Sequence, residues 1–216
     1  MHYLRNKRFA KRQRYFAKHY LQNNDLTLIS SNCLGGLIYH DAKQQFISPT
    51  IDMTYSPEDF LYLVEHFDEL ENTELTIVKS DKNWPVANLL FKKENKSIVI
   101  EFVHYHAFEE AKDAFYRRVR RITNNRVVLF TQKHLSYEIA KRFNDLPYKK
   151  LCIYGDYEPK CEDIFNKVND ETVFTKCNTY LTSKRDILSF RYVLGRKFIL
   201  DIGLDFDYYS FLFFRK

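Results

Sequence analysis

The chain has 216 residues, of which 45% are hydrophobic and 17% aromatic, which is ample for a packed core in one large domain or two small ones. It contains no stretch approaching the roughly 20 uncharged apolar residues of a membrane-spanning helix, and its N-terminus lacks the apolar segment of a secretory signal, so we expect a cytoplasmic protein. The net charge of +6 gathers at one end, because residues 1–24 hold seven lysines and arginines and no acidic residue.

Residues 1–24 are predicted to form a basic N-terminal helix in which aromatic side chains alternate with the positive charges. Such a helix fits three roles. It docks on the domain through its aromatic residues and leaves its charges in solvent, or it makes a peripheral contact with anionic lipid at the inner face of the membrane. Contact with nucleic acid is the least favoured of the three.

The next segments alternate between strand and helix patterns. A short apolar strand is expected at 26–31, and it runs into a turn at 32–36 that opens a helix. Ser56-Pro57-Glu58-Asp59 is typical of a helix start, with serine as the cap and proline in the first turn. Further strands are expected at 75–78, 97–103, 126–131 and 149–154, and further helices at 108–122 and 135–144. This alternation predicts an α/β fold with three layers, in which helices cover both faces of a mainly parallel sheet. With no linker-like tract, residues 25–216 are expected to form one domain.

The cysteines at 33, 152, 161 and 177 are irregularly spaced, which disfavours a disulfide framework and structural zinc; two of them are expected to be small buried hydrophobes. Cys33 differs, because it follows a predicted strand and opens a helix. His104 also follows a predicted strand. If the two strands are parallel neighbours, both side chains reach the same rim of the sheet, where such folds bind ligands.

A thiol at a helix N-terminus beside an imidazole is expected to have a lowered pKa and to act as a nucleophile, with the imidazole as base. Asn32, Gly35 and Gly36 are the candidate oxyanion donors, and Tyr105 and His106 are expected to line the substrate site. The alternative is structural: a cysteine followed by two glycines in a turn, and a histidine at a strand end, are both common without any catalytic role.

The helix at 108–122 carries a basic face that is a candidate phosphate-binding surface, formed by Arg117, Arg120 and Arg121 together with Arg118. A solvated face is the alternative, since Asp113 and Arg117 are spaced for an ion pair. No metal site is expected, because the grouping of His104 and His106 with Asp52 and Asp59 has unremarkable spacing. The Asp-x-Asp pair at Asp205 and Asp207 is a weak match to the metal-binding pair of nucleotide-sugar glycosyltransferases.

A series of motifs runs in order along residues 25–155. They are Ser31-Asn32-Cys33-Leu34-Gly35-Gly36, Ser48-Pro49-Thr50, Asp59-Phe60, Trp84-Pro85, Phe102-Val103-His104-Tyr105, Phe108-Glu109-Glu110-Ala111 and the run from Arg117 to Arg121. Together they resemble the bacterial exopolysaccharide-biosynthesis family catalogued as domain of unknown function nineteen-nineteen. The chain departs from that family at Leu34 and Phe115, where we expect the family to have tryptophan, and both changes bear on pocket shape more than on chemistry.

The resemblance implies a role in the biosynthesis of capsule, exopolysaccharide or lipopolysaccharide, but it implies no particular reaction. A strand followed by Asn-Cys, with a later histidine, is also similar to cysteine-dependent polysaccharide acetyltransferases. The first hypothesis is transfer of an acyl group from an acyl-coenzyme A donor to a hydroxyl of a glycan or glycan-lipid acceptor, with Cys33 as nucleophile and His104 as base. One alternative is a nucleotide-sugar-dependent glycosyltransferase that uses the arginine face and Asp205 and Asp207. The other is a non-catalytic docking partner of a glycan-assembly complex that acts through residues 1–24.

Overall fold

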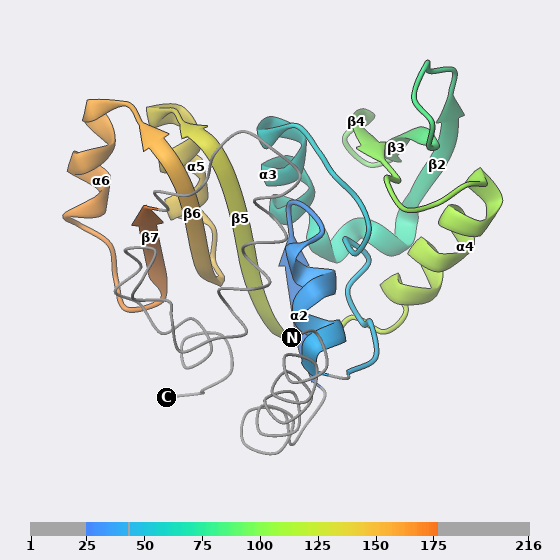
Figure 1. Cartoon of the computed structure of the whole chain (residues 1–216), viewed down its shortest axis with the longest axis horizontal. Helices are drawn as coiled ribbons and strands as arrows, with labels where there is room; N and C mark the ends of the chain where they lie inside the picture. Colours follow the sequence, from blue (N-terminus) through green and yellow to red (C-terminus); the bar gives the residue numbers. More distant parts are fainter. Residues whose placement is uncertain (1–24, 43, 177–216) are drawn as a thin grey trace, which may run out of the picture.

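The computed structural model describes residues 25–42 and 44–176, so the predicted helix at 1–24, Cys177, Asp205 and Asp207 lie outside the described residues. The elements in chain order are β1 (Leu26–Ser30), α2 (Leu34–Ala42), α3 (Pro57–Glu65), η1 (Phe67–Asn72), β2 (Thr73–Val78), β3 (Val86–Phe91), β4 (Lys96–Glu101), α4 (Phe108–Val119), β5 (Asn125–Leu135), α5 (Tyr137–Asp145), β6 (Lys149–Tyr157), η2 (Pro159–Cys161), α6 (Glu162–Phe165) and β7 (Thr172–Lys176) (Figure 1). Among the helices that the structure describes, none has the length and apolar character to cross a lipid bilayer.

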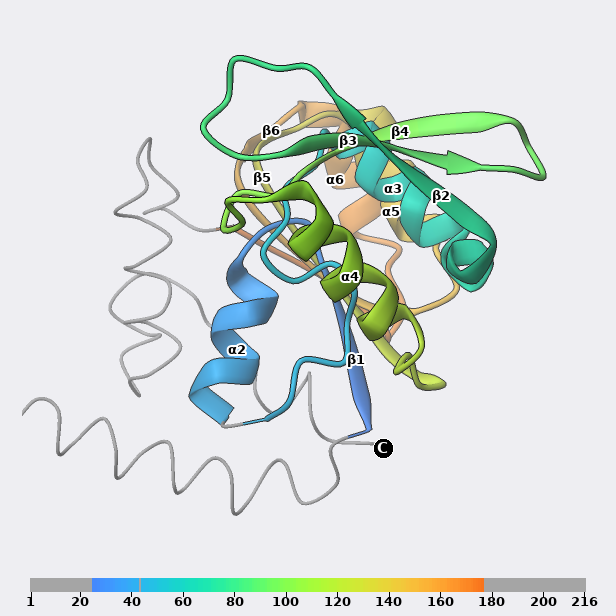
Figure 2. The same ribbon diagram turned by 90° about the vertical axis from the view of Figure 1, so that its right-hand side faces the viewer.

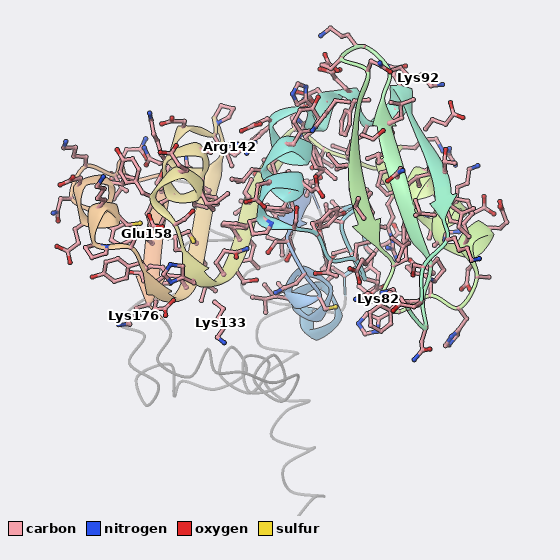
Figure 3. The ribbon with its side chains drawn as sticks, turned by 90° about the horizontal axis from the view of Figure 1, so that it is seen from above. Lys82, Lys92, Lys133, Arg142, Glu158 and Lys176 are labelled. Atoms are coloured by element: carbon pink, nitrogen blue, oxygen red, sulfur yellow. The ribbon has the colours of Figure 1, made fainter. Side chains whose placement is uncertain are left out.

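Four of these strands form the parallel sheet, in the order β1-β5-β6-β7. The central strands β5 and β6 contain continuous buried apolar runs, as strands covered on both faces do. Helices α3 and α5 pack side by side, and Arg142 on α5 donates to the Glu65 carboxylate on α3 at 2.9 Å (Figure 3). The predicted α/β fold with a parallel sheet is confirmed, whereas the complete three-layer arrangement stays a prediction.

The strands expected at 75–78 and 97–103 do not join the parallel sheet. They correspond to β2 and β4 of a separate antiparallel sheet, in which β3, which the sequence analysis did not predict, lies between them. The turn between β3 and β4 contains Asn95 with a left-handed φ of 51°, and so short a connection joins antiparallel strands only. Figure 3 shows the two sheets on either side of α3.

One hydrophobic core links the two sheets through α3. The Phe60 ring on α3 stacks on Phe130 of β5 with ring centroids 5.4 Å apart, and Phe130 stacks in turn on Phe143 of α5 at 5.5 Å. Buried residues of β3 and β4 belong to the same core. Cys152 and Cys161 are also fully buried in it, which confirms that two of the cysteines serve as small hydrophobes.

The segment 48–54 connects the ends of β1 and β4. The Ser30 backbone N–H on β1 donates to the Thr50 hydroxyl at 2.9 Å. Thr54 exchanges two backbone hydrogen bonds with Glu101, the last residue of β4, at 3.0 and 3.1 Å. Figure 2 shows this segment passing between α2, which lies alongside β1, and α4. The turns that follow β1 and β4 are therefore held next to each other although their strands belong to different sheets.

Replacing Ser56 with alanine should lower the free energy of unfolding by about 1 kcal/mol, the usual value of an N-cap side chain. The Ser56 hydroxyl accepts a hydrogen bond from the Asp59 backbone N–H at 3.1 Å at the start of α3, and alanine leaves that donor without its cap. Denaturant unfolding is the measurement, and Ser97→Ala, at an exposed position of β4, is the control. Equal losses in the two variants would contradict the capping role.

Candidate active site

The structure brings Cys33 and His104 together. The Cys33 Sγ lies 3.0 Å from the His104 Nε2, which is within hydrogen-bond reach. Cys33 sits in the turn between β1 and α2 and is half-buried, while His104 lies in the turn after β4 and is exposed. An exposed imidazole touching a half-buried thiol is accessible to a substrate and has the geometry of a nucleophile with its base. Their catalytic roles stay predictions.

The reason the two residues meet differs from the expected one. The condition considered for their meeting, that β1 and the strand before His104 are parallel neighbours, is not met, because β4 belongs to the antiparallel sheet. The meeting depends on segment 48–54, which bonds to Ser30 at one end and to Glu101 at the other. The residue pair predicted from the sequence is thus brought together across two sheets.

Several polar groups of the turn that carries Cys33 form hydrogen bonds within the turn or to the neighbouring strands. The Asn32 carboxamide oxygen accepts from the Leu34 N–H at 2.9 Å, and its amide group donates to the Thr131 hydroxyl on β5. The Gly35 N–H donates to the Ser30 hydroxyl at 3.2 Å. The Gly35 N–H is therefore engaged within the turn and is not a free oxyanion donor, whereas Asn32 keeps a second amide hydrogen and its oxyanion role stays a prediction. As the third residue of α2, Gly36 keeps an N–H among the terminal donors that have no acceptor within the helix.

The charge state of Cys33 also differs from expectation. Burial raises the pKa of the Cys33 thiol to about 11, the negative charge of Asp52 adds to that rise, and the backbone N–H of Cys33 lowers it. We expected the pKa of this thiol to lie below its ordinary value, and that expectation is wrong, because desolvation and the charge of Asp52 outweigh the backbone hydrogen bond. At neutral pH the resting residue is a thiol, and its proton must leave as it reacts.

Two residues at the site, Arg118 and Asp52, have surroundings that differ from those the sequence predicted for them. Arg118 of α4 is buried, and its Nη1 donates to the Ile51 carbonyl at 2.9 Å while its Nη2 lies 3.7 Å from the Asp52 Oδ2. The sequence signal for Arg118 is its spacing, since it follows Phe115 by three residues on the buried face of α4. The sequence analysis weighed Asp52 only as a metal ligand, and no local pattern reveals its left-handed φ of 67°.

The other predicted site residues differ in how exposed they are and in what they contact. Tyr105 is buried; burial raises its pKa, and the positive charge of Arg118 opposes the rise. His106 is exposed. Of the predicted phosphate-binding arginines, Arg117 and Arg120 are exposed, and the Arg121 Nη1 donates to the Phe46 carbonyl at 3.4 Å. Of the four arginines of the predicted basic face, Arg118 is the one whose guanidinium lies beside Asp52, and phosphate binding by the other three stays a prediction.

Within residues 25–42 and 44–176, the side chains that gather closely enough to hold a metal ion are those of His66, Glu69 and Glu94, whose ligand atoms lie within 4.8 Å of one another. The Lys93 ammonium already lies 3.6 Å from Glu69 and 3.5 Å from Glu94. His66 bonds Glu69 at 3.2 Å. These contacts neutralise the carboxylates with groups of the chain itself, and the cluster includes neither Cys33 nor His104.

Comparison with known proteins places the chain in a family. Residues 4–193 match the family model described as a domain of unknown function (DUF1919). A protein of Haemophilus influenzae described as "Uncharacterized protein" is 33% identical over 150 residues, which cover 67% of this chain and 70% of that protein. The family match spans both β1 with the Cys33 turn and β4 with the His104 turn. The chain therefore belongs to the family described as domain of unknown function (DUF1919).

Proposed function

We propose that the chain is an acyltransferase in which Cys33 carries the acyl group and His104 moves the proton. The observation that carries the proposal is the 3.0 Å contact between the Cys33 Sγ and the His104 Nε2 at an accessible site. A thiol with a raised pKa is a weak nucleophile by itself, so a base in direct contact is what its chemistry requires. The contact requires a His104 tautomer with its proton on Nδ1 for Nε2 to accept.

The reaction is written with a thioester donor such as acyl-coenzyme A. As the Cys33 sulfur bonds to the carbonyl carbon, its proton passes to the His104 Nε2, and the carbonyl oxygen becomes an oxyanion next to the Gly36 N–H. Collapse of this tetrahedral intermediate breaks the bond to the donor sulfur, which leaves as a thiol after taking the proton from His104. An acceptor hydroxyl then attacks the Cys33 thioester while His104 takes the hydroxyl proton, and the departing sulfur regains it.

The acceptor class comes from the family likeness. We propose a hydroxyl of a surface glycan or glycan-lipid as the acceptor, on the basis of the resemblance to exopolysaccharide-biosynthesis proteins, and peripheral contact with the cytoplasmic membrane face through residues 1–24. The acceptor class and the membrane contact can each be wrong without affecting the proposed chemistry of Cys33. A glycosyltransferase or a docking partner in place of an acyltransferase would leave Cys33 dispensable.

Intact mass spectrometry tests the thiol step. Incubation with short acyl-coenzyme A donors, or with p-nitrophenyl acetate as a donor-independent probe, should add one acyl group to the wild-type chain. Cys33→Ser should lack this adduct, and Cys177→Ser, which removes a different thiol of the chain, should retain it. An adduct that persists in Cys33→Ser, or a wild-type protein that no donor acylates, would overturn the proposal.

A further inference from the structure

Asp52 occupies an unusual backbone position beside the proposed nucleophile. Its φ of 67° lies in the left-handed region, which aspartate enters more readily than most residues but which still favours glycine. The residue belongs to segment 48–54, which holds the two turns of the site together. Strained positions of this kind persist where the surroundings fix them, and they concentrate at functional sites.

The surroundings orient the Asp52 carboxylate toward α2. On one side the Arg118 Nη2 lies 3.7 Å from the Asp52 Oδ2. The Arg118 side chain is 8% exposed and the Asp52 side chain is 29% exposed. On the other side, Oδ1 lies 3.6 Å from the point where a Cβ on Gly36 would stand. The carboxylate thus faces the first turn of α2, which begins directly after Cys33, while part of it stays open to solvent.

The charged and titratable groups around the Cys33 sulfur come from three elements. His104, from the turn after β4, contacts the sulfur directly. Asp52, from segment 48–54, supplies the negative charge that raises the pKa of Cys33. Arg118 of α4 lies beside Asp52, and the charges of both residues act on Tyr105. A negative charge close to a sulfur opposes formation of a second negative charge on that sulfur.

We propose that Asp52 is a positioning residue of this site, whose carboxylate, oriented by Arg118, keeps Cys33 in its thiol form until an electrophile is bound. The proton then leaves for His104 only as the new bond to sulfur forms. A resting thiol is far less prone to oxidation and stray alkylation than a thiolate. In naming the electrophile as an acyl donor, this inference rests on the proposed function, whereas control of the thiol charge does not depend on it.

The test measures how fast iodoacetamide alkylates Cys33 between pH 7 and pH 9, followed by intact mass and peptide mapping. Below its pKa, the alkylation rate follows the thiolate fraction, so a pKa lower by one unit raises the rate about tenfold. Asp52→Asn lowers the pKa of Cys33 and should therefore raise the rate at pH 8 measurably, by up to about tenfold if the pKa falls by a full unit. Asp52→Gly removes the same charge and suits the left-handed backbone, so it should give the same increase in a chain whose fold is relieved of strain.

Two comparisons make the result specific. Asp52→Glu restores the charge and should return the rate toward that of the wild type. Asp156→Asn, which removes an exposed carboxylate paired with His134, should leave the rate unchanged. Unchanged alkylation in both Asp52→Asn and Asp52→Gly, or an equal increase in Asp156→Asn, would overturn the proposal. Alkylation needs no acyl donor, so a protein that fails to accept acyl groups still reports on Asp52.

Discussion

Replacing His104 with glutamine should slow acylation of Cys33 about 10²- to 10⁴-fold, the usual contribution of a positioned general base. Glutamine retains a polar side chain but cannot take the thiol proton at neutral pH. Because burial raises the pKa of Cys33 to about 11, very little thiolate is present without the base, and the variant has no alternative route to a nucleophile. The His104 side chain is exposed, so the fold should be unaffected.

The measurement is the release of p-nitrophenolate from p-nitrophenyl acetate, followed over pH 6 to pH 10. The remaining rate in His104→Gln should rise steeply with pH, because it then depends on the thiolate fraction alone. His134→Gln is the matched control, since this exposed histidine pairs with Asp156 near the carboxyl ends of β5 and β6 and is not the histidine that contacts Cys33. Rates that fall equally in both variants, or a His104→Gln variant as active as the wild type, would exclude His104 as the base.

The pairing of Cys33 with His104 could be predicted from the sequence, although the condition on which it was argued, two parallel neighbouring strands, is not met. Each residue follows a recognisable apolar strand, and the family motifs include both. What local patterns do not encode is which strands pair. Thr50 and Thr54 determine the pairing of the two turns, because they bond to Ser30 and Glu101, and such contacts between distant residues leave no periodicity in the sequence.

The antiparallel sheet was missed for a related reason. The sequence indicated strands at the positions of β2 and β4, but β3, Val86–Phe91, which follows Trp84-Pro85 closely, was not predicted. Without β3, the two neighbouring strands had no local partner and were assigned to the parallel sheet. Helix α3 was predicted more closely, because Ser56, Pro57 and two acidic residues give it an unambiguous start.

The roles of small polar residues in the Cys33 turn could not be predicted from residue type. An asparagine amide and a glycine N–H suit an oxyanion site as well as they suit a tight turn. The structure resolves the choice for Gly35, whose N–H bonds Ser30, and shows that Asn32 caps Leu34 and reaches Thr131. The two glycines therefore matter first for how closely α2 approaches β1 and segment 48–54, and a matched pair of substitutions separates the two positions.

Gly35→Ala should lower the free energy of unfolding by about 1–3 kcal/mol relative to Gly36→Ala, the usual cost of overpacking. A Cβ on Gly35 would stand 2.7 Å from the Ser30 Cβ, which the β1 backbone fixes, whereas a Cβ on Gly36 would stand 3.0 Å from an Ile51 methyl group that can yield slightly. The gain in helix propensity of about 1 kcal/mol is common to both variants and cancels.

The clash between a Cβ on Gly35 and Ser30 should also lower the reaction rate at Cys33. Relieving it moves the first turn of α2 and Cys33 with it, and a displacement near 1 Å costs a reaction about 10²-fold. We therefore expect Gly35→Ala to lower the acylation rate of Cys33 about 10²-fold in the protein that remains folded. Denaturant unfolding of both variants and the p-nitrophenyl acetate assay on Gly35→Ala are the measurements. Equal stability of the two variants, or an undiminished rate in Gly35→Ala, would contradict a site whose geometry depends on close contact between α2 and β1.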